Sequence, residues 1–176
     1  MNELQADLET WIYKWVSVYN KKLQAVPCPF AKQAYVDNKI LIRELKRVDT
    51  LAMTDYFAAE LENYTYHWPK DIEVVALGCR PDLVDSIELS DIVKRCNKSF
   101  LKNRGYVALE DHPNSLEIVA GEIMNQGSWA LVLIQPKDKL DKASAILEKQ
   151  GYYKSWSQEN LDDVVNWRKK ILNKLV

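Results

Sequence analysis

The sequence predicts an α+β domain, and three observations lead to this prediction. Short apolar runs, typical of strands, occur at 40–42, 72–77 and 129–135, and the first begins a strand expected to extend to residue 47. Amphipathic stretches typical of helices lie between and around these runs. Two of the runs begin strand–helix–strand units, which favours a ferredoxin-like (βαββαβ-type) sheet with an insertion and with helices added at both ends. A doubly wound α/β sheet is the alternative, because strands and helices alternate along the chain.

Residues 1–36 are expected to form a helical N-terminal extension. Apolar side chains recur three and four residues apart and place one stripe along a helix over residues 2–20. The stripe consists of Leu4, Leu8, Trp11, Trp15 and Val18. Pro27 and Pro29 end any continuation of this helix, and residues 30–36 then form a short second helix.

The first strand–helix–strand unit begins with the strand at 40–47. Asp49 or Thr50 is expected to cap the next helix, because short polar side chains accept hydrogen bonds from the free backbone N–H groups at a helix start. The apolar face of this helix consists of Met53, Phe57, Leu61 and Tyr64. The run at 72–77 follows a proline and completes the unit as a buried strand.

Residues 79–127 are expected to form an insertion between the two units. Within it, residues 89–103 read as a helix, residues 106–110 as a strand, and residues 115–124 as an irregular or helical piece. The whole chain has only 5 glycines, which argues against a glycine-rich binding loop in this segment or elsewhere.

The second unit begins with a central strand at 129–135. Asp138 is expected to cap the helix that follows, and Gly151 is expected to end it. Residues 152–156 read Tyr-Tyr-Lys-Ser-Trp, which is typical of a strand, and they complete the unit.

A C-terminal helix over residues 157–176, capped by Asn160, completes a single α+β domain that spans residues 1–176. A chain of this length buries roughly 70% of its unfolded surface. It therefore needs neither a disulfide nor a structural metal to form its core.

Charge and composition exclude several classes of protein. Lys and Arg together number 24 and Asp and Glu 25, whereas a nucleic-acid binder shows a basic excess or a basic stripe. No apolar run approaches the ~20 residues of a transmembrane helix, and the polar first residues do not resemble a secretory signal. The 3 cysteines cannot all pair within the chain. We therefore expect a cytoplasmic protein with reduced thiols and with neither nucleic acid nor membrane as a partner.

Cys28 is the first candidate for catalysis. Two prolines flank it at the predicted start of a short helix, where the helix dipole can lower a thiol pKa and favour the reactive thiolate. Residues 28–32, Cys-Pro-Phe-Ala-Lys, are similar to the Cys-Pro-Phe-Cys motif of glutaredoxins with the second cysteine absent. A helix rather than a strand precedes the motif, so we favour a buried, unreactive thiol in a proline-rich turn.

The same residues resemble a motif of an uncharacterised bacterial family of unknown function, which carries Asn-Leu-Cys-Pro-Phe-Ala after its opening helix. Residues 103–106, Asn-Arg-Gly-Tyr, include Arg104 and resemble an Asn-Arg-Ser-Pro-Tyr-Pro stretch of that family. The resemblance implies a compact α+β domain and no particular activity. Residues 124–132 also resemble part of uncharacterised proteins of cyanobacterial bacteriophages.

The second candidate site is a run of ionisable residues, Glu110, Asp111 and His112. They follow a predicted strand, and loops after strands often carry functional side chains that act as general bases or metal ligands. Successive side chains of an extended chain point to opposite faces, so the three cannot converge without a sharp turn. We therefore favour Asp111 or Asn114 as a helix cap for residues 115–124.

His67, beside Trp68, is the only other histidine. Two histidines and a carboxylate can bind a transition metal. The His-x-x-His and His-x-x-x-His spacings of helical sites are absent, however, and no Cys-x-x-Cys pair supports a zinc site. We therefore predict neither a metal nor a cofactor. The residues retained as binding candidates are His67, Trp68, Arg104, Asp111 and Asn114.

Aromatic residues are abundant, with 6 Trp, 9 Tyr and 3 Phe, and they gather at 64–68 and 152–156. An RNA-recognition sheet would need flanking Lys and Arg residues, whereas aromatic side chains are enriched in protein interfaces. The predicted function is therefore a small cytoplasmic binding or accessory module that associates with a second copy of itself or with a protein partner through aromatic-rich surfaces. A small molecule is the secondary candidate for its ligand. The alternative is a small-molecule enzyme that uses Cys28 or the Glu110–His112 run.

Overall fold

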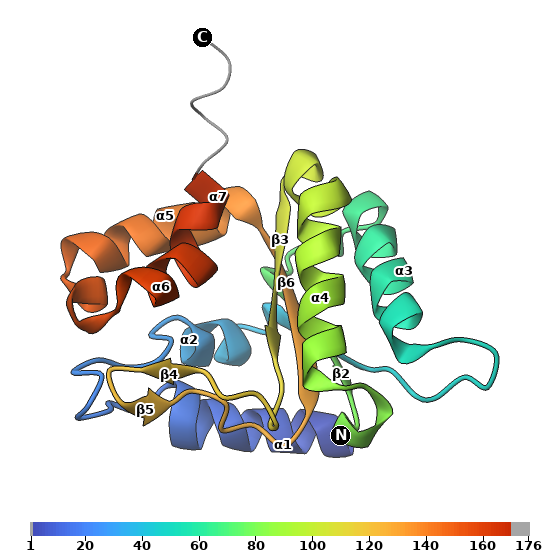
Figure 1. The fold of residues 1–176 in the computed structure, drawn as a ribbon, viewed down its shortest axis with the longest axis horizontal. Helices are drawn as coiled ribbons and strands as arrows, with labels where there is room; N and C mark the ends of the chain where they lie inside the picture. Colours follow the sequence, from blue (N-terminus) through green and yellow to red (C-terminus); the bar gives the residue numbers. More distant parts are fainter. Residues whose placement is uncertain (1, 170–176) are drawn as a thin grey trace, which may run out of the picture.

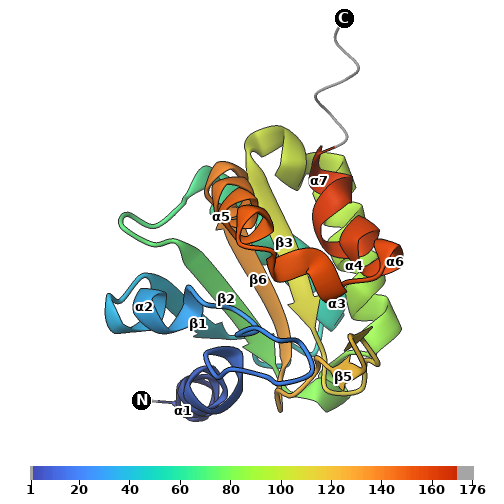
Figure 2. The same cartoon turned by 90° about the vertical axis from the view of Figure 1, so that its left-hand side faces the viewer.

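A four-stranded mixed sheet forms the centre of the computed structural model, which describes residues 2–169. Across the sheet the strands are, in order, β1 (Ile40–Glu44), β2 (Val74–Cys79), β6 (Ala130–Pro136) and β3 (Tyr106–Asp111). β1 is parallel to β2, and β6 is antiparallel to both β2 and β3. Strands β1, β2 and β3 therefore point the same way, and β1 and β3 are the two edges of the sheet (Figure 2).

Helices cover both sides of the sheet (Figure 1). One face packs against α3 (Met53–Tyr66) and α4 (Ser86–Cys96), and α4 continues into a π-helical turn (Asn97–Leu101) and a 3-10 turn (Lys102–Arg104). The other side carries α1 (Glu3–Trp11) with a π-helical turn after it (Ile12–Val16), α2 (Ala31–Val36) and α5 (Lys137–Lys149). Among the described helices, none has the length and apolar character needed to cross a membrane.

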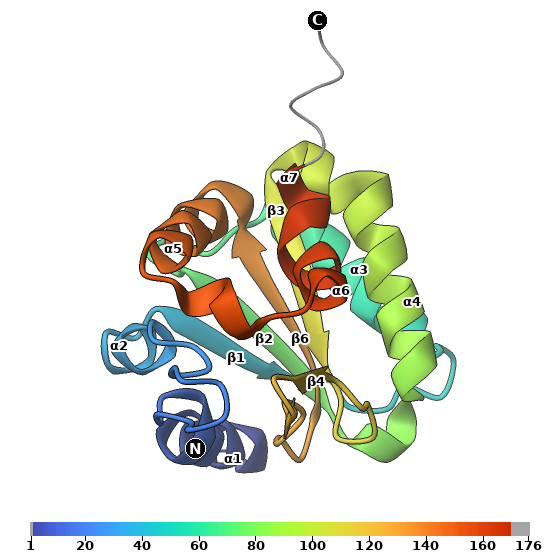
Figure 3. The same cartoon turned by 60° about the vertical axis from the view of Figure 1, so that its left-hand side comes forward.

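Short elements complete the fold. After α5, a 3-10 turn (Tyr152–Ser155) leads to α6 (Gln158–Leu161), a π-helical turn (Asp162–Asn166) and α7 (Trp167–Lys169). A hairpin of β4 (Ile118–Val119) and β5 (Glu122–Ile123) lies in the connection from β3 to β6, and a 3-10 turn (Pro81–Leu83) follows β2. Figure 3 shows α6 and α7 in front of the β3 side of the sheet and next to α4.

The predicted α+β class is confirmed, and the first strand–helix–strand unit is present as β1, α3 and β2. The predicted caps of its helix are wrong, because α3 begins after Ala52, which provides no side-chain cap. Val48 and Leu51 form an isolated β-bridge, and Asp49 and Thr50 lie in the turn between them. Asp49 and Thr50 therefore belong to this turn and do not cap α3.

The second predicted strand–helix–strand unit is wrong in its last strand. Residues 152–155 form a 3-10 turn, because Gly151 turns the chain with a left-handed φ of 78°. The three aromatic side chains of this segment pack on one another, with ring centroids 5.0 to 6.0 Å apart. The fourth strand of the sheet is instead β3, from the segment expected to be an insertion at 79–127. The sheet therefore departs from the ferredoxin-like strand order, and antiparallel β6 distinguishes it from a parallel doubly wound sheet.

The terminal helices are confirmed in part. The helix expected over residues 2–20 ends at Val16, while α2 matches the short second helix. At the other end, Ser157 rather than Asn160 is the N-cap of α6, since its side chain accepts a hydrogen bond from the Asn160 N–H. Residues 170–176 of the expected C-terminal helix lie outside the described residues.

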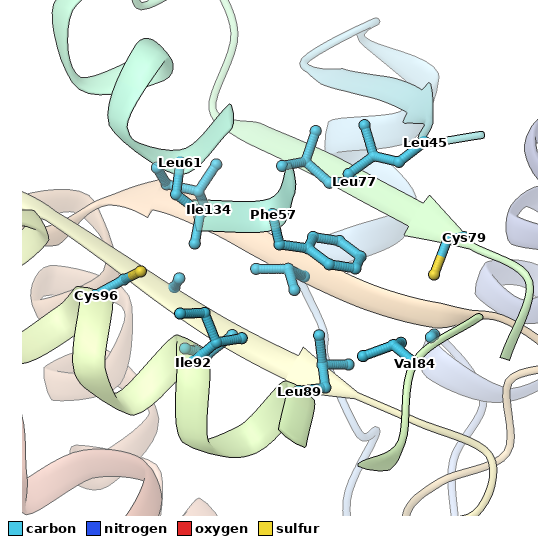
Figure 4. Close-up of a cluster of buried hydrophobic side chains, with 14 of the residues drawn as sticks. Leu45, Phe57, Leu61, Leu77, Cys79, Val84, Leu89, Ile92, Cys96 and Ile134 are labelled. Atoms are coloured by element: carbon cyan, nitrogen blue, oxygen red, sulfur yellow. The ribbon is translucent and has the colours of Figure 1, made fainter. Parts of the chain in front are cut away.

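The main hydrophobic core lies between the sheet and the α3–α4 pair (Figure 4). Its large side chains include Phe57 and Leu61 of α3, Leu89 and Ile92 of α4, and Leu77 and Ile134 of the sheet. Cys79 and Cys96 lie in the same core, where burial raises the pKa of Cys79 to about 12 and that of Cys96 to about 11. Both residues therefore serve as small apolar packing groups.

A second core joins α1 to the opposite face of the sheet. Leu4 and Leu8 pack against Ala76 and Leu131. Gly78 permits this close approach, because a Cβ atom there would lie 2.8 Å from Leu4 Cδ1. The N-terminal helix is therefore an integral layer of the fold.

Candidate functional site

A cleft of about 550 Å³ lies at the free edge of β3. Ala108, Leu109 and Glu110 of β3 contribute to it. Its other residues come from α4 and the turns after it, from the loop before β4, and from the segment between α5 and α7. Segments far apart in the sequence thus meet at one edge of the sheet, which makes this cleft the main candidate for a ligand site.

Lysines at spacings of four residues line one side of the cleft: Lys94, Lys98 and Lys102. Lys94 forms an exposed ion pair with Asp163, with 3.9 Å between Nζ and Oδ1. Lys102 Nζ donates to the Trp167 carbonyl at 2.9 Å and lies 5.2 Å from the centre of its ring. Burial, reinforced by nearby Lys137, lowers the pKa of Lys102.

Two half-buried carboxyl groups, Glu110 and Glu117, also line the cleft. Burial is the main cause that raises the pKa of Glu110, although the Ser90 hydroxyl donates to its Oε1 at 2.7 Å. Burial also raises the pKa of Glu117, and the negative charges of Asp111, Asp163 and Glu110 raise it further. Within residues 2–169 neither glutamate forms a salt bridge. The charge of Glu110 thus helps to raise the pKa of Glu117, while the positive charge of nearby Lys94 lowers the pKa of Glu110.

The floor of the cleft is closed by Asn97, a buried residue. Its Nδ2 donates to the Ala108 carbonyl at 2.8 Å, and its Oδ1 accepts from the Ala108 N–H at 2.9 Å. One amide side chain thus satisfies both outward-facing backbone groups of a residue on the edge strand, as a neighbouring strand would.

Asp111 lies on the opposite face of β3 from Glu110. Its Oδ1 accepts from Asn125 Nδ2 at 2.7 Å, and burial raises its pKa. Asp111 Oδ2 and Trp11 Nε1 are both buried without a hydrogen-bond partner within the described residues. They flank Gly127, where a Cβ atom would lie 3.3 Å from the first and 3.7 Å from the second. The structure therefore separates the two adjacent carboxyl groups instead of pairing them.

His112 is a buried structural residue. Its Nδ1 accepts from the Asn114 N–H at 3.1 Å, so the ring proton is on Nε2. Nε2 lies 3.2 Å from the Pro81 carbonyl oxygen and 3.1 Å from that of Val84. Both ring nitrogens are thus engaged with backbone groups, and the imidazole joins the end of β3 to the turn after β2.

The predicted helix cap at Asp111 or Asn114 is wrong, because no helix follows. Residues 115–124 contain the β4–β5 hairpin, in which Ala120 and Gly121 form the turn with positive φ values of 51° and 77°. Asn114 is an exposed residue of the preceding turn. Its backbone N–H donates to His112 Nδ1.

The remaining binding candidates lie away from the cleft, around the end of α3. His67 is exposed, with Nδ1 3.1 Å from Asn63 Oδ1. Trp68 Nε1 donates to the Ile72 carbonyl at 3.0 Å, and its ring lies 4.9 Å from that of Tyr106. The structure brings none of these residues to Glu110.

Arg104 links the turns after α4 to α3. Its guanidinium lies 4.5 Å from the centre of the Tyr66 ring and 5.3 Å from that of Phe100. It also donates to Glu62 at 3.3 Å and to Thr65 at 3.0 Å. These contacts join the turn after α4 to the end of α3 at the protein surface.

Cys28 lies in the loop between α1 and α2, and its N–H donates to the Val16 carbonyl at 2.8 Å. The residue is half-buried. Burial raises the pKa of its thiol and outweighs the N–H groups of Phe30 and Ala31, which lower it. The Tyr152 hydroxyl donates to the Pro27 carbonyl next to it. The environment therefore favours the thiol rather than the thiolate.

We expect Cys28 to react with iodoacetamide at pH 7 more slowly than a free cysteine does, because its thiolate is disfavoured by burial. Peptide mapping by mass spectrometry would measure the rate at each cysteine. The same protein in urea provides the control, in which all three thiols should react at the free rate. A Cys28 rate at or above that of free cysteine in the folded protein would contradict this assignment.

The sequence did not reveal that the segments lining the cleft meet at one edge of the sheet. Glu110 was identified from its place after a strand, and the four-residue spacing of the lysines is a readable signal for one helical face. Glu117, Trp156 and Trp167 carry no local signal of their own. They join the site because the β3–β6 connection and the chain after α5 both return to the β3 edge.

No group of three or more His, Cys, Asp or Glu side chains within residues 2–169 is placed to hold a metal ion. Comparisons of the chain with protein-family models, with curated proteins and with solved structures find no match. The geometry of the cleft is therefore the feature of the chain from which a function can be inferred.

Proposed function

We propose that the protein is a binding module, and that the cleft at the β3 edge binds a small molecule with an amine or guanidinium group. The observation that carries the proposal is the pair Glu110 and Glu117. Their pKa values are raised by burial, and the charge of Glu110 raises that of Glu117. A cationic group in the cleft would offset the desolvation of both carboxylates and the repulsion that Glu110 exerts on Glu117.

The walls of the cleft suit the apolar part of such a ligand. Leu109 and the indole of Trp156 both line it. Trp156 is held by Tyr152 and Tyr153, with ring centroids 6.0 and 5.2 Å away. A rigid indole next to carboxylates is a recurrent means of binding organic cations, because the ring face attracts positive charge.

The alternative, catalysis by Cys28 or by the Glu110–His112 run, has less support. Asp111 faces away from Glu110, both nitrogens of His112 are engaged with backbone groups, and the Cys28 thiol is disfavoured as a thiolate. We propose a cytoplasmic location for the module, and the three free cysteines support this proposal.

Butylguanidinium, titrated at pH 7, is expected to shift the NMR signals of the Trp156 indole N–H and the Glu110 amide. Butyrate has a chain of the same length and the opposite charge, and it should leave these signals unchanged. Glu117→Gln should weaken guanidinium binding roughly tenfold, because a carboxylate contact within a part-buried site is worth more than a surface pair. Glu159→Gln is the matched control, since Glu159 is exposed and does not line the cleft.

Binding should also weaken as the pH falls, because protonation removes the charge that attracts the cation. The loss should begin above the ordinary glutamate pKa of 4.5, since the pKa values of Glu110 and Glu117 are raised. Equal binding of butyrate, or guanidinium binding that Glu117→Gln does not change, would contradict the proposal.

A further inference from the structure

The lining of the β3 cleft contains charges of both signs. We infer that the ligand of the cleft carries two charged groups, namely the amine or guanidinium bound by Glu110 and Glu117 and a carboxylate bound by Lys98. A short alkyl chain separates the two groups, so the ligand belongs to the ω-guanidino or ω-amino acids. This assignment rests on the function proposed above, because it adds a second charged group to the same ligand.

Lys98 is the lysine of the cleft that is left for a ligand. Lys94 is paired with Asp163, with 3.9 Å between Nζ and Oδ1, and Lys102 Nζ donates to the Trp167 carbonyl at 2.9 Å. Lys98 is exposed and has neither an ion-pair nor a hydrogen-bond partner for its ammonium group within residues 2–169. The two glutamates of the cleft likewise form no salt bridge within these residues. One cation and two carboxylates therefore remain to be matched by charges of a ligand.

These unpaired charges lie at different levels of α4, which runs alongside β3 (Figure 1). The Ser90 hydroxyl of α4 donates to Glu110 Oε1 at 2.7 Å, which places Glu110 at the level of Ser90. Lys98 follows Ser90 by two helical turns, or roughly 12 Å along the axis at a rise of about 1.5 Å per residue. A compact cation contacts only one of these levels, whereas a ligand with a charge at each end contacts both.

The length of a short ω-guanidino acid matches this separation. An extended chain advances roughly 3.5 Å for every three bonds, so 4-guanidinobutyrate, with seven bonds from its outermost nitrogen to a carboxylate oxygen, is about 8 Å long. Hydrogen bonds of about 2.8 Å at both ends extend this reach to about 14 Å. The flexible stem of Lys98 can take up the remaining difference. The cleft, with a volume of about 550 Å³, has room for a molecule of this size.

The test compares 4-guanidinobutyrate with butylguanidinium, in which a methyl group replaces the carboxylate at the end of the same chain. In NMR titrations at pH 7 we expect 4-guanidinobutyrate to bind roughly fivefold more tightly, the upper range for an ion pair with an exposed lysine. It should also shift the side-chain signals of Lys98, which butylguanidinium should leave unchanged. Butyrate lacks the cationic group that the two glutamates bind, so it is not expected to occupy the cleft.

Variants of two cations on the same helical segment separate a direct contact from a general effect of charge. Lys98→Gln should reduce the affinity for 4-guanidinobutyrate to that for butylguanidinium, without weakening the binding of butylguanidinium. Lys98→Arg keeps the charge and should keep the preference. Arg95→Gln is the matched control, because Arg95 is exposed on α4 and does not line the cleft. This control removes one positive charge and should leave the preference unchanged.

The outcomes distinguish this inference from the proposed function. Binding of butylguanidinium without a preference for 4-guanidinobutyrate would overturn the inference and leave the proposed function intact. A preference that Lys98→Gln does not change, or that Arg95→Gln removes equally, would also overturn it. If neither compound binds, the proposed function fails, and the assignment of Lys98 fails with it.

Discussion

Replacement of His112 by alanine is expected to lower the free energy of unfolding by about 3 kcal/mol. His112 is 1% exposed and contacts three backbone groups, namely the carbonyls of Pro81 and Val84 and the N–H of Asn114. The alanine variant leaves these groups without their partner in a buried position, where an unsatisfied polar group costs roughly 1–3 kcal/mol. Chemical denaturation at pH 7 would measure the change.

His67→Ala is the matched control for this prediction. His67 is the other histidine of the chain, it is exposed, and its ring lies near a single polar side chain, Asn63. We expect its loss to change the stability by less than about 0.5 kcal/mol. Equal effects of the two variants would show that the backbone contacts of His112 do not stabilise the fold.

The sequence predicted those helices and strands that a periodic pattern within one segment can indicate. The stripe through Leu4 and Leu8 gave the opening helix, and the spacing of Phe57 and Leu61 gave α3. Both depend on the 3.6-residue period of a single helix, which a sequence displays directly. The first strand–helix–strand unit was found for the same reason, since a parallel pair joined by a helix is formed by neighbours along the chain.

The order of the strands across the sheet could not be predicted from such patterns. Residues 152–156 have strand composition, yet their aromatic rings pack together in a turn, and the fourth strand is β3 instead. Composition indicates that a segment suits a pleated, half-buried surface, but not which strand it pairs with. The pairing is decided by contacts between residues far apart in the chain, such as Leu109 with Leu133.

The candidate site was also predicted only in part. Alternation along an extended chain implied that Glu110 and Asp111 would face opposite ways, and they do. The burial of His112 between backbone carbonyls was missed, because Pro81 and Val84 lie about thirty residues before it. A run of three ionisable residues therefore divides into a cleft carboxylate, a buried acid on the other face and a structural histidine.

Replacement of Asn97 by alanine is expected to destabilise the protein by about 3 kcal/mol as well, and to loosen the edge of β3 locally. The variant removes both partners of the Ala108 backbone, an acceptor at 2.9 Å and a donor at 2.8 Å, from a buried position. Hydrogen exchange of the Ala108 amide should speed up more than that of Leu109, which pairs with β6, because only the outward-facing N–H loses its acceptor.

Asn103→Ala provides the comparison within the same cleft, since Asn103 also lines it but is exposed. It should leave both the stability and the exchange of Ala108 unchanged. If Asn97→Ala lowers the stability without a selective effect on Ala108, the side chain supports the packing of α4 rather than the edge strand. A selective effect would instead establish that this chain caps the β3 edge of its sheet with its own amide side chain.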